Sequence, residues 1–138
     1  PLDPEEELTA WCSSHMEHMR AESALIRACM ADYDARPEVA PAACAGPLQA
    51  WSEVQRYLRR LRELGLVDRG IDLDIAGAMF MSAAFGDAMG RDMIAEMFPG
   101  PVDRAARAYT RLFLRMVAPR VATGMMGREV VAGTTSTD

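Results

Sequence analysis

Apolar residues recur at three- and four-residue steps along the first quarter of the chain, which is the period of an α-helix. Asp3 and Pro4 mark its start, because Asp caps a helix and Pro fits the first helical position, while Glu6 occupies the capping-box position. No glycine or further proline follows until Pro37. The pattern therefore predicts one continuous helix of about 45 Å, at about 1.5 Å per residue.

Proline and glycine divide the next part of the chain. Residues 38–45 lie among prolines, so we expect only a short helix or a loop there. Pro47 is expected to open a second long helix, with one apolar stripe and an arginine-rich outer face, and Gly65 is a natural C-terminal stop.

Two more helices are expected in the remaining sequence. Asp72 or Asp74 is placed to cap a third helix that runs toward Gly90 and has little polar surface. After the break at residues 99–101, residues 102–117 show the most regular apolar stripe of the chain.

The predicted fold class is all-α, an antiparallel helical bundle of four long helices plus short helices. The length of 138 residues suits one domain, and no convincing strand or internal repeat appears. We assign residues 1–122 to this domain and residues 123–138 to a C-terminal tail rich in glycine, threonine and serine.

Net charge, the length of the longest apolar run and the spacing of the cysteines limit the classes of protein to which the chain can belong. The formal net charge of −5 argues against a nucleic-acid surface in this segment. The longest apolar run, residues 75–86, is shorter than the roughly 20 residues that a bilayer requires, so no membrane contact is expected. Cys12, Cys29 and Cys44 have no CxxC spacing, which favours reduced thiols and a cytoplasmic protein over a disulfide framework.

The third expected helix is apolar on nearly all sides, and a chain this short has few elements to cover it. A second copy is the natural cover, although a central core helix in a monomer is the alternative. The predicted dimer interface takes small, aromatic and long apolar residues from the last two long helices: Ala78, Ser82, Phe85, Met89, Tyr109, Phe113 and Leu114.

Eleven methionines are many for this length, and their thioethers adapt to irregular apolar ligands. Each such residue is more often plain core, but together they suggest a pocket for an uncharged or weakly polar organic molecule. The candidate ligand-binding residues are Trp11, Cys12, His15, Met16, Met19, Trp51, Val54, Tyr57, Met79 and Met81.

Metal binding and catalysis have less support. Cys12, His15, His18 and Glu22 share one side of the first helix, but zinc ligands usually converge from more than one element, so we expect no metal or other cofactor. No nucleophile–base ordering or phosphate loop is present, and we expect no enzyme. The arginines of residues 56–62 suit an anion, but such groups more often form a solvated face.

Two segments resemble the C-terminal domain of TetR-family transcriptional regulators. One begins with GPLQAW at residues 46–51 and continues through RRLRELGLV at 59–67 and DLD at 72–74. The other contains AFGDAMGRD at 84–92 and VDRAARAYTRLFL at 102–114. Together they cover most of residues 46–117.

The resemblance implies a regulator, most simply a repressor, that dimerises through its last two long helices and holds a small effector among the earlier ones. It also implies operator DNA bound only through an N-terminal helix-turn-helix domain, and the first residues, which lack an initiator methionine, lead us to expect an upstream segment. The alternatives are a helical homodimeric interaction module without a ligand and, less favoured, a helical-bundle metal protein.

Overall fold

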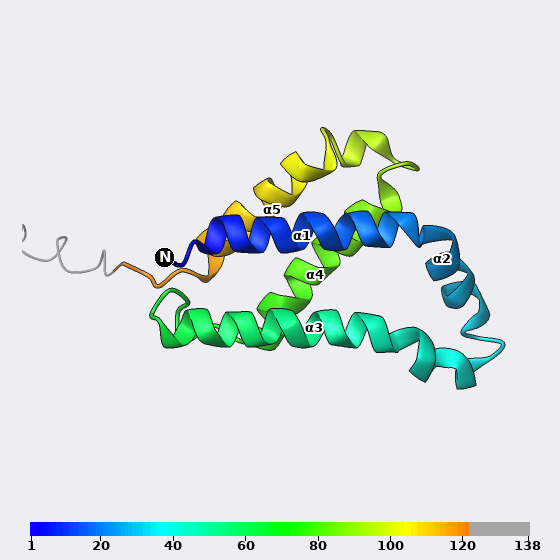
Figure 1. The fold of residues 1–138 in the computed structure, drawn as a ribbon, viewed down its shortest axis with the longest axis horizontal. Coiled ribbons are helices and arrows are strands. Elements are labelled where there is room, and N and C mark those ends of the chain that lie inside the picture. Colours follow the sequence, from blue (N-terminus) through cyan, green and yellow to red (C-terminus); the bar gives the residue numbers. More distant parts are fainter. Residues whose placement is uncertain (122–138) are drawn as a thin grey trace, which may run out of the picture.

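A computed structural model describes residues 1–121 of the chain, and the predicted tail at residues 123–138 lies outside this part. The described residues are all-α, as the sequence predicts, without strands (Figure 1). The helices are α1 (Pro4–Ala21), α2 (Ser23–Asp32), α3 (Ala40–Glu63), α4 (Leu73–Gly90) and α5 (Val102–Val117), with short 3₁₀ turns η1 (Pro37–Val39) and η2 (Ala95–Met97).

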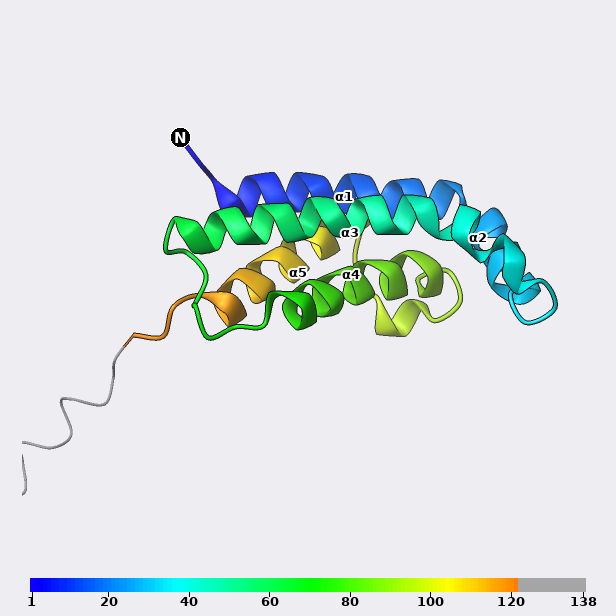
Figure 2. The same cartoon turned by 90° about the horizontal axis from the view of Figure 1, so that it is seen from below.

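The helices form two layers, with α1 and α3 in one and α4 and α5 in the other (Figure 2). α1 packs closely on α5 and α4, and α3 packs on α4, whereas α1 and α3 lie farther apart. α4 crosses behind both of them (Figure 1). It is therefore the central helix that joins the two layers.

Side-chain caps fix two helix starts at the predicted residues. The Asp3 carboxylate accepts a hydrogen bond from the Glu6 backbone N–H at 3.1 Å. Asp72 accepts from Asp74 and Ile75 at 2.9 and 3.2 Å. Each cap satisfies backbone donors that have no partner within the helix, which explains why the helices begin there.

α3 ends just before Gly65, the residue that the sequence predicts as its stop. This glycine has a φ of +77°, which residues with a Cβ adopt at a cost. The reversal lets the Leu66 N–H donate to the Leu61 carbonyl at 2.9 Å and the Gly65 N–H donate to Arg62 at 3.0 Å. These two bonds close a Schellman motif, so the glycine ends the helix by satisfying its last carbonyls.

The prediction of one continuous first helix is wrong, because the chain bends at Glu22 between α1 and α2. No proline or glycine marks this position, and Glu22 has a φ of −96° and a ψ of 12°. The bend turns α2 out of line with α1 (Figure 2). Arg27 then donates to the Met89 carbonyl at 2.8 Å, a tertiary contact that the local pattern does not encode.

The predicted start of the second long helix is also wrong. α3 begins at Ala40, and Pro47 lies inside it. Alanine has the highest helix propensity, and residues 40–45 contain four alanines. Gly46 has no Cβ to clash with the following proline ring. This half of α3 is exposed to water, which can bond the carbonyl that Pro47 leaves without a donor.

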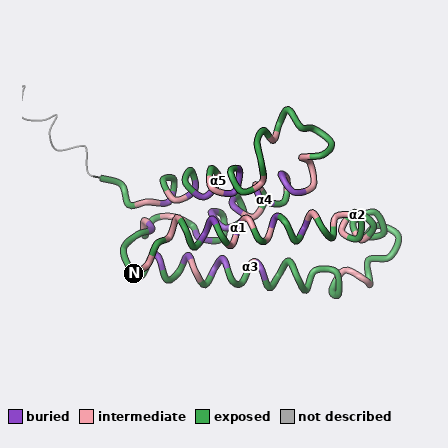
Figure 3. The backbone as a smooth tube through the Cα atoms, turned by 45° about the horizontal axis from the view of Figure 1, so that its top comes forward, coloured by how far each residue is buried: buried purple, intermediate pink, exposed green. Residues whose placement is uncertain are grey.

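Burial is concentrated in one end of the molecule. Buried residues lie on α1, α4, α5 and on α3 from Ala50 onward, whereas α2 contains none (Figure 3). Phe80 of α4 lies at the centre, with its ring 4.8 Å from that of Phe113 and 6.3 Å from that of Trp11. Among residues 1–121, no helix is both long and apolar enough to cross a bilayer.

Candidate functional site

One face of α4 is left uncovered by the chain. Its side chains follow the helical period opposite the buried face, and the exposed ones are Ile75, Ala78, Met79, Ser82 and Phe85. Ile75 and Met79 expose 60% and 53% of their surface. None of the exposed residues is charged between Ile75 and the end of the helix. About three turns of solvent-facing helix without a charge are typical of a surface that meets a partner.

α5 extends this apolar surface. Leu112 and Met116 expose 69% and 43% of their surface. They follow Tyr109 at steps of three and seven residues and so share its side of the helix. The Tyr109 hydroxyl donates to Asp87 of α4, which shows that this side of α5 faces α4. The uncovered apolar face, defined as the exposed α4 residues above together with Leu112 and Met116, therefore spans two helices.

The predicted dimer-interface residues fall into two groups. Ala78, Ser82 and Phe85 lie on the uncovered apolar face, and Met89 is half-buried at its end. The three from α5 lie deeper: Phe113 is buried against Phe80, while Tyr109 and Leu114 are half-buried and pack against the core. The α5 stripe in the sequence did not reveal which of its residues the chain itself covers.

The seam between α1 and α3 is the second candidate region. Two hydrogen bonds cross it in opposite directions, each from a ring to a carboxylate. Trp11 of α1 donates to Glu53 of α3 at 3.0 Å, and Tyr57 of α3 donates to Glu7 of α1 at 2.6 Å. Because the two backbones do not pack closely, these long side chains hold the helices together across the space between them.

His15 lies on the same seam, stacked on Trp11 with ring centroids 4.8 Å apart. Burial lowers the pKa of its imidazole below the ordinary value of 6.5, and the nearby His18 adds to this effect, whereas Glu53 opposes it. The hydrogen bond from Trp11 lowers the pKa of Glu53. At neutral pH the seam therefore combines aromatic rings, a neutral imidazole and an ionised carboxylate.

The structure brings most predicted ligand-binding residues to this seam or to the core beneath it. Trp11, His15, Trp51, Tyr57 and Met81 are half-buried, and Cys12, Met16, Met19 and Val54 are buried. Met79 is separate, because it lies on the uncovered apolar face of α4.

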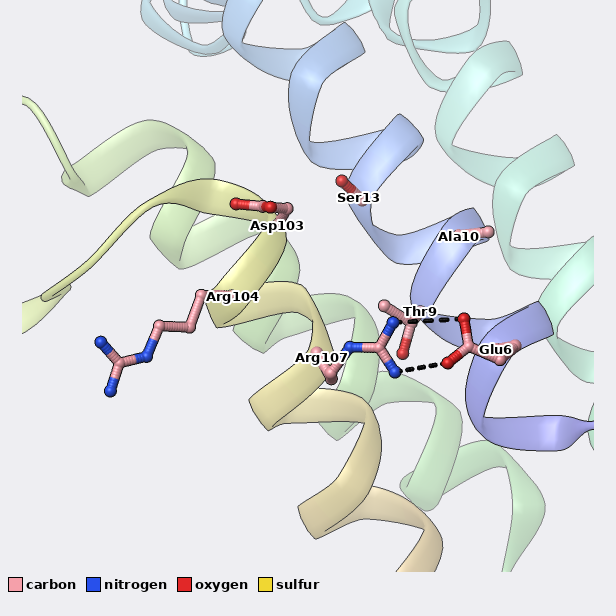
Figure 4. A pocket seen from close by; sticks show the side chains of 7 residues that line it. All are labelled: Glu6, Thr9, Ala10, Ser13, Asp103, Arg104 and Arg107. Atoms are coloured by element: carbon pink, nitrogen blue, oxygen red, sulfur yellow. Dashed lines mark hydrogen bonds and ion pairs between the residues drawn. The ribbon is translucent and has the colours of Figure 1, made fainter.

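The two best-formed hollows of the described residues lie elsewhere, on the surface. A groove of about 470 Å³ runs between α1 and α5, and Figure 4 shows the Glu6–Arg107 ion pair crossing it. Thr9 lines the groove, and its hydroxyl is buried without a partner in the described residues. The second hollow, about 310 Å³, is lined by Arg62, Glu63 and Arg69. Neither contains a predicted ligand-binding residue.

Sequence reasoning missed a buried polar group at the centre of the fold. Asp87 of α4 is fully buried, with Arg91 and Tyr109 as partners. The signal available in the sequence is an aspartate directly after the apolar run of residues 75–86.

The possible metal ligands do not converge. In the described part of the chain, no three His, Cys, Asp or Glu side chains are placed to hold an ion together. Cys12 is buried, and this raises the pKa of its thiol to about 12, so the thiolate that binds metal is disfavoured. The arginines at 56, 59 and 60 are exposed on α3.

The chain was compared with protein-family models, with curated proteins and with solved structures, and no match was found.

Proposed function

We propose that this chain is the effector-binding and dimerisation domain of a TetR-type transcriptional regulator. In such a protein, operator DNA is bound by a separate N-terminal domain, and the domain described here senses a small, mostly apolar molecule. The proposal rests on the resemblance of residues 46–117 to that family and on one structural observation, the uncovered apolar face of α4 and α5.

A second copy of the chain is the partner that fits this face. A two-fold interface uses the same patch on both copies, so an uncharged strip can meet itself without unpaired charges. Ala78 and Ser82 are small enough for a helix of the partner to approach closely. Pairing of α4 and α5 with their copies would form a four-helix interface.

The α1–α3 seam supports the effector part of the proposal. It lies on the other side of α4 from the uncovered apolar face, so one helix borders both regions. A ligand that separates α1 from α3 would act on α4 and on the dimer through it. The shift in population is limited by the difference in ligand affinity between the two states.

The dimer is tested by light scattering and sedimentation of the purified chain. We expect twice the chain mass of 15.1 kDa at micromolar concentration. Met79→Arg places a charge on the uncovered apolar face and should give a monomer with unchanged helicity. Leu48→Arg is the matched control, because Leu48 is also exposed, at 60%, but lies on α3. A wild-type chain that remains monomeric at hundreds of micromolar contradicts the proposal.

The effector site is tested with N-phenyl-1-naphthylamine, an uncharged apolar fluorophore. Trp11 lies at the seam, where it bonds Glu53 and stacks on His15, so binding there should quench its fluorescence. Ala10→Leu fills the α1–α5 groove instead and should leave the quenching unchanged. Loss of binding in this variant would place the probe in the groove and contradict a seam site.

A homodimeric interaction module without a ligand is the second candidate. It is favoured by the position of the best-formed hollows, which are open surface grooves away from the seam. Dimerisation together with no binding of the apolar probe would favour this function.

A further inference from the structure

A fully buried carboxylate links the two helices that carry the uncovered apolar face. Asp87 accepts from Arg91 through both of its oxygens, Oδ1 from Nε at 2.7 Å and Oδ2 from Nη2 at 3.0 Å. Oδ2 also accepts from the Tyr109 hydroxyl of α5 at 2.6 Å. Arg91 donates further to the Gly100 carbonyl, just before α5. One buried charge thus connects α4, the following loop and α5.

This arrangement does more than neutralise a charge. An ionised carboxylate inside a protein is costly, and apolar residues of similar volume often give equal or higher stability. The Asp87–Arg91 pair lies within four residues of one chain segment and needs nothing from α5. The Tyr109 bond is the additional element: with the contact between Phe113 and Phe80, it joins one side of α5 to α4.

The rotation of α5 about its own axis affects which of its side chains lie on the uncovered apolar face. Leu112 and Met116 share the side of Tyr109, whereas Arg107 and Arg111 are turned toward α1, where they pair with Glu5. A rotation of α5 about its axis would carry Leu112 and Met116 away from α4. The apolar strips of the two helices would then no longer form one surface.

We propose that Asp87 and Tyr109 are positioning residues of the dimer interface: their buried hydrogen bond aligns the apolar strips of α4 and α5 into the surface that receives a second copy. The inference rests on the proposed dimer. Neither side chain needs to contact the partner, because the pair acts through Leu112 and Met116.

Tyr109→Phe is the direct test, since it removes one hydroxyl and leaves the ring and the Asp87–Arg91 pair in place. We expect unchanged helicity by circular dichroism and a dimer dissociation constant raised at least about fivefold, the low end of typical coupling between sites. Thr110→Val is the matched control, because it removes a buried α5 hydroxyl that bonds nothing in the described residues and should leave the constant within twofold.

A purely structural role gives a different result. Tyr109→Phe would then lower the free energy of unfolding, measured in the monomeric Met79→Arg background, without changing the dissociation constant of the dimer. That outcome overturns this inference and leaves the proposed dimer standing. If the wild-type chain itself does not dimerise, the proposed function fails first, so the two failures are distinguishable.

Discussion

The two faces of α4 differ in what covers them, although both are apolar. The inner face carries Phe80, Ala84 and the buried Asp87 and is enclosed by α1, α3 and α5. The outer face carries Ile75 and Met79, which are more than half exposed. Hydrophobicity alone thus does not determine burial within one chain. The outer face is the surface on which we propose that a second copy binds.

The largest expected change in the free energy of unfolding comes from replacing one phenylalanine on each face of α4 with alanine. Phe80→Ala should lower the free energy of unfolding by about 3–5 kcal/mol, because it removes a buried ring and leaves a cavity between α1, α4 and α5. Phe85→Ala, on the outer face, should cost about 1 kcal/mol or less. Both are measured by urea unfolding in the Met79→Arg background, which excludes dimer effects. Equal losses would mean that the two faces are not different.

Two glycines of α4 give the next comparison. A Cβ at Gly77 on the inner face would lie 2.4 Å from Gln55 Nε2 and 3.2 Å from Trp51, whereas one at Gly86 would meet nothing within 4 Å. Gly77→Ala should therefore cost about 1–3 kcal/mol, because Gln55 must leave its 2.9 Å bond to the Leu73 carbonyl.

Gly86→Ala should have the opposite sign and stabilise the monomer by about 0.5–1 kcal/mol, since alanine costs less conformational entropy in a helix. Thermal unfolding of the two variants in parallel gives the comparison. A stabilising Gly77→Ala would show that α3 does not press on α4 there.

A smaller effect is expected from pH, through His15 at the α1–α3 seam. The pKa of its imidazole is lower in the folded protein than the ordinary 6.5 of the unfolded chain. At pH values between these two pKa values, the unfolded chain binds more protons than the folded protein, so the free energy of unfolding rises with pH. Stability is therefore lost as the pH falls below about 7. The wild type should lose more than His15→Gln between pH 7.5 and 5.5, by less than about 1 kcal/mol after solvent screening. Identical pH profiles would contradict burial of the imidazole.

The smallest effect is expected at Thr110, which is buried on α5 with a hydroxyl that has no partner in the described residues. Thr110→Val replaces a buried hydroxyl that has no hydrogen-bond partner in the described residues with a methyl group of similar size. The free energy of unfolding should stay the same or rise slightly. A loss above about 1 kcal/mol, measured by urea unfolding, would show that the hydroxyl is bonded in solution.

The sequence alone was sufficient to predict the all-α class, the caps at Asp3 and Asp72, the stop at Gly65 and the extent of α5. These features depend on residues within a few positions of each other, where backbone sterics and capping bonds act locally. It also placed Trp11 and Tyr57 among the candidate ligand-binding residues, because wide aromatic rings on apolar stripes are visible without knowledge of packing.

Three features depend on how the helices pack: the bend at Glu22, the helical start of α3 before Pro47 and the division of α4 into covered and uncovered faces. The Arg27–Met89, Gln55–Leu73 and Asp87–Tyr109 bonds join residues 18 to 62 positions apart, so no local pattern records them. A helix that is apolar on all sides predicts that other elements or another molecule will cover it. Which side its own chain covers depends on how the other helices pack, and that is a property of the assembled fold.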